Sequence, residues 1–266
     1  METKYIVDFY NSHDEDGRLT SKHGKVEFLT TMRYIEKYLK KGDRVLEIGA
    51  ATGRYSHTLA RQGYSVDAVE LVERNIEIFR KNTLPTEDIT IMQGNALDLS
   101  SIPDNKYDIT LLLGPLYHLY TDEDKRRALS EAIRVTRQGG IIFAAYVISD
   151  VCVIEEGFYR NKFSVAEYIK NGLIVPETFA TKSEPKELFE LVRKENIDNL
   201  MSTLPVTRLH YVASNGLSQL LRETVDGMDD ETFELYLKYH FAVCEREDMV
   251  GMTSHSLDVF KKNQKL

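Results

Sequence analysis

The regular alternation of strand-like and helix-like segments between residues 44 and 148 constrains the fold of this chain more than any other feature. Two continuous apolar runs, at 109–113 and 141–148, are typical of strands that are buried on both faces of a sheet. Strands that alternate with helices form a parallel sheet with right-handed crossovers, and the helices then cover both sheet faces. The sequence therefore predicts a doubly wound α/β fold.

The ends of the expected elements follow from apolar periodicity and from helix stop signals such as Gly42, Gly63 and Gly139. The expected helices lie at 25–41, 54–62, 74–82, 121–137, 215–225 and 229–246. The expected strands lie at 44–48, 65–70, 89–93, 107–113, 140–148, 209–213 and 256–261. The periodicity does not fix the position of the sixth strand within the sheet.

A glycine-containing turn joins the first of these strands to the next helix. Its sequence is Val45-Leu46-Glu47-Ile48-Gly49-Ala50-Ala51-Thr52-Gly53. Glycines permit a tight turn and a close approach of a ligand to the backbone, and ligands of open α/β sheets bind at the carboxyl ends of the strands. A dinucleotide is disfavoured, because the pattern G-x-G-x-x-G counted from Gly49 needs glycines where Ala51 and Arg54 stand.

Two acidic residues favour a different ligand. Glu47 comes just before the turn, where a carboxylate repels a pyrophosphate but attracts a ligand that carries an ammonium and a sulfonium. Glu70 ends the second strand, where a carboxylate can bind both hydroxyls of a ribose. The glycine turn alone could exist without a ligand, and Glu70 alone could be a solvated acid at a strand end. Together they favour a nucleoside with cationic substituents.

These residues resemble motif I and the ribose-binding acid of the class I S-adenosylmethionine-dependent methyltransferases. Motif I of that family reads hydrophobic-hydrophobic-acid-hydrophobic-G-x-G-x-G, and Ala51 stands in place of its middle glycine. The resemblance extends to Gly94-Asn95-Ala96-Leu97-Asp98 and to the helix and two glycines at 134–142. It covers residues 40–148 well and the rest of the chain poorly.

The resemblance implies a doubly wound, mostly parallel, seven-stranded Rossmann-like sheet with a helical cap insertion and an N-terminal helical lid. We expect four parts. Residues 1–40 would form the lid and the first helix, and residues 41–150 the core that binds S-adenosyl-L-methionine. Residues 151–206 would form the helical cap insertion, and residues 207–266 would complete the core.

The resemblance also implies a set of cofactor contacts. Glu70 would bind the ribose, Leu71 would lie beside the adenine, and Asn95 would accept from the adenine amino group. Arg18 would pair with the methionine carboxylate, with a hydrogen bond from Tyr10. The residues expected to contact the cofactor are Tyr10, Arg18, Glu47, Gly49, Ala50, Ala51, Thr52, Gly53, Glu70, Leu71, Asn95, Ala96, Leu97, Leu113 and Gly114.

The end of the fourth strand would lie beside the reactive methyl group. It carries Gly-Pro-Leu-Tyr-His-Leu, which resembles a subgroup of small-molecule or uncharacterised bacterial enzymes, and it lacks the N-P-P-Y or D-P-P-Y of enzymes that methylate base amino groups or glutamine amides. His118 is a candidate general base, since histidine accepts protons near neutral pH, although it could also be a packed strand-end residue. Tyr117 could face the sulfonium or be part of the core.

Composition narrows the function further. The formal net charge of −8 disfavours an extended nucleic-acid contact, and Cys152 and Cys244 have no metal-ligand spacing, so we expect no metal site. The chain shows no signal peptide and no apolar stretch long enough for a membrane span. We expect a cytoplasmic enzyme that methylates an O or N atom of a small molecule. The alternatives are an RNA or protein methyltransferase and a non-catalytic S-adenosylmethionine-binding protein. The sequence does not determine the acceptor or the oligomeric state.

Overall fold

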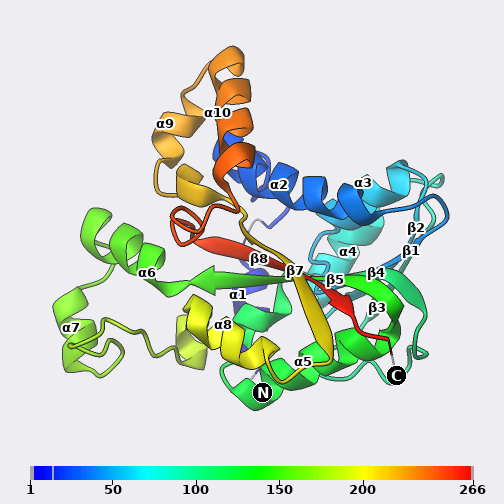
Figure 1. The fold of residues 1–266 in the computed structure, drawn as a ribbon, viewed down its shortest axis with the longest axis horizontal. Helices are drawn as coiled ribbons and strands as arrows, with labels where there is room; N and C mark the ends of the chain where they lie inside the picture. Colours follow the sequence, from blue (N-terminus) through cyan, green and yellow to red (C-terminus); the bar gives the residue numbers. More distant parts are fainter. Residues whose placement is uncertain (1–2, 14, 265–266) are drawn as a thin grey trace.

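A central sheet of eight strands organises the chain, as seen in the computed structural model, which describes residues 3–13 and 15–264 (Figure 1). Seven strands follow the order β3-β2-β1-β4-β5-β8-β7, and β6 pairs with β5 off this path. Strands β1 to β5 are parallel, whereas β8 runs antiparallel to both of its neighbours. The strands are β1 Arg44–Ile48, β2 Ser65–Glu70, β3 Ile89–Gln93, β4 Tyr107–Leu112, β5 Thr136–Ile148, β6 Leu191–Val192, β7 Val206–Ala213 and β8 His255–Lys262. The predicted doubly wound, mostly parallel fold is confirmed.

Helices cover both faces of the sheet. Apolar side chains of α2 and α3 pack on one face with Val45 and Phe143, while α5 and α8 pack on the other with Leu46 and Ile142. Side chains that alternate along buried strands supply both cores. The helices are α1 Lys4–Tyr10, α2 Lys22–Tyr38, α3 Arg54–Arg61, α4 Glu73–Asn82, α5 Asp122–Val135, α6 Ser149–Cys152, α7 Val165–Lys170, α8 Lys194–Met201, α9 Arg222–Asp226 and α10 Asp230–Val243.

Several predicted boundaries are wrong. The helices expected at 25–41 and 229–246 span Lys22–Tyr38 and Asp230–Val243, and the strand expected at 209–213 begins at Val206. The helix expected at 121–137 ends at Val135, and β5 begins at Thr136, whose hydroxyl is hydrogen-bonded to that of Thr110 on β4. Gly139, taken as a helix stop, instead lies inside β5 with a φ of +72°, within the irregularity between Thr136 and Ile141 in the pairing with β4. The helix expected at 215–225 is reduced to a short 3₁₀ turn at Gly216–Ser218 and to α9.

The sixth strand, whose position the sequence did not fix, is β7 at the sheet edge beyond β8. Residues 149–205 join β5 to β7 and extend beyond the carboxyl end of β5, with α6 and α7 at the left of Figure 1. This segment also holds a π-helix at Val153–Tyr159 and the short strand β6, which was not predicted. The division of the chain into four parts stays a prediction.

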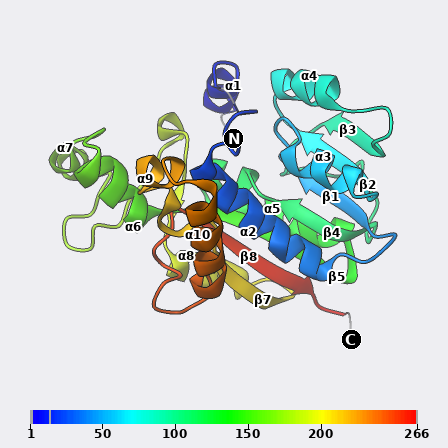
Figure 2. The same cartoon turned by 90° about the horizontal axis from the view of Figure 1, so that it is seen from above.

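The N-terminal helix α1 lies beside the start of α4 (Figure 2). Its buried Ile6 packs with Val72, which precedes α4, and with Leu188 of the segment between β5 and β7. These contacts bring three distant parts of the chain together above the strand ends. Among the described residues, no helix combines the length and apolar character that a membrane crossing requires.

Candidate functional site

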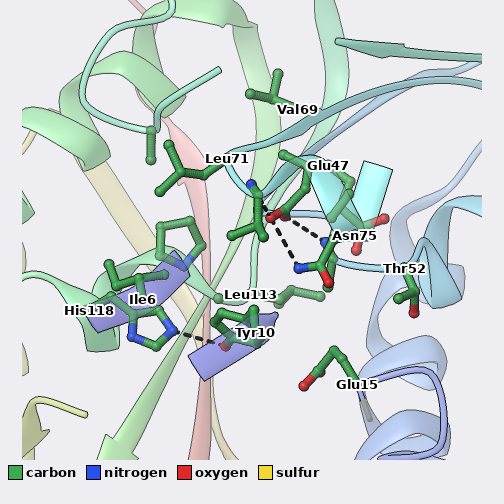
Figure 3. A pocket seen from close by; sticks show the side chains of 18 of the residues that line it. Ile6, Tyr10, Glu15, Glu47, Thr52, Val69, Leu71, Asn75, Leu113 and His118 are labelled. Atoms are coloured by element: carbon green, nitrogen blue, oxygen red, sulfur yellow. Dashed lines mark hydrogen bonds between the residues drawn. The ribbon is translucent and has the colours of Figure 1, made fainter. Parts of the chain in front are cut away.

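A cavity of about 1010 Å³, counted to its mouth, lies at the carboxyl ends of β1, β2 and β4 (Figure 3). All the residues predicted to bind the cofactor or act in catalysis line this cavity, except Gly53 and Leu97. For Gly53 and Leu97 the contact with the cofactor stays a prediction. Gly53 lies behind the turn, against the ring of Phe79, and Leu97 is buried in the core. The main lining residues that the sequence analysis missed are Ile6, Glu15, Tyr55, Asn75 and Pro115.

The turn after β1 has a backbone that favours glycine at three positions. Gly49 and Gly53 have φ values of +74° and +89°. A Cβ on Gly49 would lie 2.7 Å from the ring of Pro115, so glycine is required there for space as well as for conformation. Ala51 adopts a left-handed φ of +47°, so the alanine keeps the shape that the middle glycine of motif I would have.

The strain at Ala51 gives a stability prediction. The Ala51→Gly variant should raise the free energy of unfolding by about 0.5–1 kcal/mol, because glycine adopts a positive φ without the clash of a Cβ. The Ala50→Gly control, at a buried neighbour without a positive φ, should lower it. Urea denaturation of both variants measures the difference, and a loss of stability in both would contradict the expectation.

Glu70 anchors the turn in this structure. Its Oε2 accepts from the backbone N–H of Ala51 at 2.8 Å, and its Oε1 accepts from the N–H of Val72 at 2.9 Å and from Asn75 Nδ2 at 3.2 Å. Burial raises the pKa of Glu70, while these donors oppose the increase. The carboxylate thus fixes the turn and faces the cavity at the same time.

Glu47 is buried at the floor of the cavity. Its Oε2 accepts from the backbone N–H of Ser56 at 3.0 Å and from the Ser56 hydroxyl, and no described residue forms a hydrogen bond with its Oε1. Burial raises the pKa of Glu47 to about 8. The negative charge expected from the sequence is therefore largely absent at neutral pH until a cationic group lies beside it.

Arg18 and Tyr10 reach the cavity from the N-terminal segment. The Arg18 guanidinium donates to Glu15 at 2.8 Å and to Glu27 at 3.1 Å. Burial would lower the pKa of Arg18, but the two carboxylates raise it well above its usual value. Its Nη2 has no partner among the described residues, so the expected pairing with a ligand carboxylate stays a prediction.

His118 has a defined tautomer. Its Nδ1 lies 2.9 Å from the carbonyl oxygen of Leu188, which can only accept, so Nδ1 carries the proton. Its Nε2 therefore accepts from the Tyr10 hydroxyl at 3.0 Å, and Figure 3 shows the two side chains pointing toward one another. Burial lowers the pKa of His118 to about 4, so the ring is neutral at pH 7.

The residue that orients His118 gives no signal in the sequence. Leu188 has a φ of +67°, which a branched side chain rarely adopts, and its carbonyl also accepts from the Tyr120 hydroxyl at 2.6 Å. The N–H of Glu190 donates to the carbonyl of Tyr117 at 2.7 Å. The segment between β5 and β7 therefore holds both candidate catalytic residues in place.

Asn95 is partly committed to the backbone. Its Oδ1 accepts from the N–H of Leu97 at 3.0 Å, which leaves one lone pair for a ligand. Tyr117 lines the cavity beside His118 with its ring 5.0 Å away, centroid to centroid. In the part of the chain that the structure describes, no cluster of three His, Cys, Asp or Glu side chains could hold a metal ion.

The chain is similar to several known methyltransferases. Residues 45–140 match the family model described as a methyltransferase domain. A protein of Methanocaldococcus jannaschii, whose name provisionally assigns it as a ribosomal RNA large subunit methyltransferase, is 31% identical over 155 residues, which are 53% of this chain and 39% of that protein. The glycine/sarcosine N-methyltransferase of Aphanothece halophytica is 25% identical over 65% of this chain and 68% of its own length. The chain thus spans less than half of the first of these relatives.

A solved structure extends the likeness to the whole fold. A SAM-dependent methyltransferase of Thermotoga maritima superposes with a TM-score of 0.60 over 98% of this chain and 100% of its own, at 20% identity. At that identity the likeness shows the fold alone. The match to the methyltransferase-domain model covers residues 45–140, and the motif I turn lies inside this stretch.

Proposed function

We propose that the protein transfers the methyl group of S-adenosylmethionine to an oxygen or nitrogen atom of a small-molecule acceptor by in-line displacement. The observation that carries the proposal is the single cavity in which Glu47, the motif I turn, Glu70 and His118 meet. The cofactor supplies an activated methyl group on a sulfonium, which is already a good leaving group. The protein then has to bind the cofactor and the acceptor, align them and exclude water.

The residues of the cavity fit this cofactor. The Glu70 carboxylate has about four lone-pair sites, three of which are used, so hydroxyl donors of a ribose can share or replace its present partners. Glu47 offers an unpaired Oε1 to an ammonium group, and Leu113 and Gly114 lie in the same lining. The carboxylates of Glu47 and Glu70 in one cavity match a ligand that carries an ammonium group and a ribose.

His118 is the proposed general base. Its Nε2 lone pair points into the cavity, and the carbonyl of Leu188 stabilises the proton on the opposite nitrogen. An acceptor hydroxyl that replaces the Tyr10 hydroxyl could give its proton to Nε2 as the new bond forms. The low pKa of the ring makes it a weak base, which suits proton removal late in the transfer.

The enclosure of His118 favours a small acceptor over RNA or protein. Tyr10 lies on one side of the imidazole and Phe189 on another, with ring centroids 5.7 and 5.4 Å from that of His118. His118 is itself buried. A methyl-accepting group of RNA or protein would have to displace both α1 and the segment around Leu188 to reach His118.

Acceptor pools test the proposal directly. Formation of S-adenosylhomocysteine from S-adenosylmethionine is measured with a metabolite filtrate, with total RNA and with ribosomal protein. Turnover with the filtrate is expected, with none above background for the two polymers. Turnover with RNA or ribosomal protein alone would instead support a macromolecular acceptor, and binding without any turnover would support a non-catalytic role.

The raised pKa of Glu47 predicts that the affinity for S-adenosylhomocysteine depends on pH. The pKa of about 8 in this structure means that binding a cationic ligand releases a proton, so the Kd for S-adenosylhomocysteine should fall by up to about tenfold per pH unit between pH 6 and 8. Glu47→Gln should bind about tenfold more weakly at pH 8 and lose most of this dependence. Calorimetric titrations in buffers of different ionisation enthalpy measure the number of protons that are released on binding. Equal pH dependence in the variant and the parent would contradict the assignment.

The proposed role of His118 predicts that its substitution lowers kcat but leaves the affinity for S-adenosylhomocysteine nearly unchanged. His118→Gln should lower kcat about 100-fold, because proton transfer loses its acceptor, while the Kd for S-adenosylhomocysteine changes less than threefold. In the parent, kcat should stay flat from pH 6 to 8, because the imidazole is neutral throughout that range. A variant with unchanged kcat would assign His118 to packing.

A further inference from the structure

A second cavity of about 1300 Å³, counted to its mouth, lies beneath the segment between β5 and β7. We propose that it is the acceptor site and that the acceptor is an uncharged molecule with an aromatic or alicyclic ring and a hydroxyl group. This inference rests on the proposed function, since the cavity has a role in methyl transfer only if the first cavity holds the cofactor. It adds the substrate class and its binding residues.

The two cavities share a thin aromatic wall. Tyr117 lines the first cavity and Phe189 the second, with ring centroids 5.8 Å apart. His255 also lines the second cavity, and its ring lies 6.1 Å from that of Tyr117. An acceptor that passes the edge of Phe189 would therefore meet the wall at Tyr117 and His118, where the methyl group is expected.

The lining of the second cavity is mainly apolar and aromatic. Phe163 and Tyr168 stack with centroids 4.3 Å apart and an interplanar angle of 31°, and Ile174 and Phe189 add further apolar surface. Cys152 contributes a neutral thiol, because burial raises its pKa to about 12. Such a surface binds rings by burial and stacking.

Three charged side chains at this cavity are compensated within the protein. Glu155 is buried and pairs with Arg160 at 3.2 Å and also with Arg222, while Glu156 pairs with Lys162 at 2.6 Å. Glu187, which accepts from the Tyr168 hydroxyl at 2.9 Å, is only partly buried, and Lys182 is exposed, so both charges keep contact with water. Beside Glu155 and Glu156 a charged ligand would lose hydration without gaining an unpaired partner, which favours a neutral one.

His255 offers a polar contact in this apolar surface. Its Nδ1 lies near Asn215 Nδ2 at 3.3 Å and near Glu27 Oε2 at 3.6 Å, whereas its Nε2 has no partner among the described residues. Because the ring lines the cavity, Nε2 is available to an acceptor hydroxyl. Together with the polar lining residues Thr181, Ser183, Gln219 and Ser254, this contact can orient a ring-bearing ligand.

The backbone around this cavity also departs from ordinary geometry. Asn161, Phe179 and Leu188 have φ values of +49°, +54° and +67°, and a π-helix at Val153–Tyr159 supplies part of the wall. Strained residues and π-helical turns concentrate at functional sites. Their gathering in one segment supports a binding role for it.

Three naphthalene probes of similar size test the inference: 2-naphthol, 2-naphthoate and 2-naphthylmethylammonium, titrated at pH 7 with and without saturating S-adenosylhomocysteine. We expect 2-naphthol to bind at least tenfold more tightly than either ion. Leu173→Trp, which fills the cavity, should weaken the binding of 2-naphthol at least tenfold, and Phe163→Ala should weaken it at least fivefold. Phe158→Ala, an exposed aromatic of the same segment outside the lining, should change it less than twofold.

The outcomes separate the two proposals. If S-adenosylhomocysteine binds while 2-naphthol does not, or if an ion binds as tightly, the acceptor assignment is wrong and the cofactor assignment stands. Equal affinities in Leu173→Trp, Phe163→Ala and Phe158→Ala would also overturn it. If 2-naphthol binds as predicted and S-adenosylhomocysteine does not, the second cavity binds neutral rings, but the proposed function and with it the acceptor role of this cavity are contradicted.

Discussion

Replacing Glu70 with alanine is expected to weaken the binding of S-adenosylhomocysteine about 100-fold. Two charge-assisted hydrogen bonds from ribose hydroxyls would be lost, which together contribute about 3 kcal/mol. The turn would also lose the acceptor of the Ala51 N–H, so part of the effect would come from a less ordered motif I. Calorimetric titration of the purified variant measures the loss.

Two further variants separate these contributions. Asn75→Ala removes one donor to Glu70 but leaves the carboxylate, so its Kd should rise less than tenfold. Glu77→Ala removes an exposed carboxylate from the same helix, α4, and should leave the Kd unchanged. Similar losses in Glu70→Ala and Glu77→Ala would show that general charge, rather than a ribose contact, controls affinity.

Gly53→Ala is expected to be the most destabilising of the substitutions considered, by about 3 kcal/mol. Its φ of +89° strains any Cβ, and that Cβ would lie 2.4 Å from the Phe79 ring and 2.8 Å from His57 Nε2. Both neighbours are buried, so neither can move freely. Urea denaturation measures the change in the free energy of unfolding.

Gly63 is a matched control for this prediction. It has nearly the same φ, +91°, but a Cβ there would meet no atom within 4 Å. Gly63→Ala should therefore cost only the backbone strain, about 1 kcal/mol. If the two variants lose equal stability, the packing of Gly53 against Phe79 contributes nothing.

The sequence predicts those parts of the site that depend on neighbours along the chain. The motif I turn and Glu70 lie at the ends of adjacent parallel strands, so fixed spacing and strand alternation bring them together. The boundary between α5 and β5 was missed because it depends on the Thr110 to Thr136 contact between strands. The two-residue strand β6 is too short for any periodicity to show.

Other features depend on contacts that no local pattern encodes. Tyr10 meets His118 across 108 residues, and the Leu188 carbonyl meets it across 70. The raised pKa of Glu47 is an effect of burial, which spacing does not reveal. The second cavity depends on the packing of the segment between β5 and β7, which lies outside residues 45–140.

The account depends most on the identity of the ligand in the first cavity. Calorimetric titration of the unmodified protein with S-adenosylhomocysteine and, separately, with NAD⁺ tests it most directly. One equivalent of S-adenosylhomocysteine should bind with a micromolar Kd, and millimolar NAD⁺ should give no binding heat. Binding of NAD⁺, or no response to millimolar S-adenosylhomocysteine, would contradict the assignment of Glu47, the turn and Glu70 to the methyl donor.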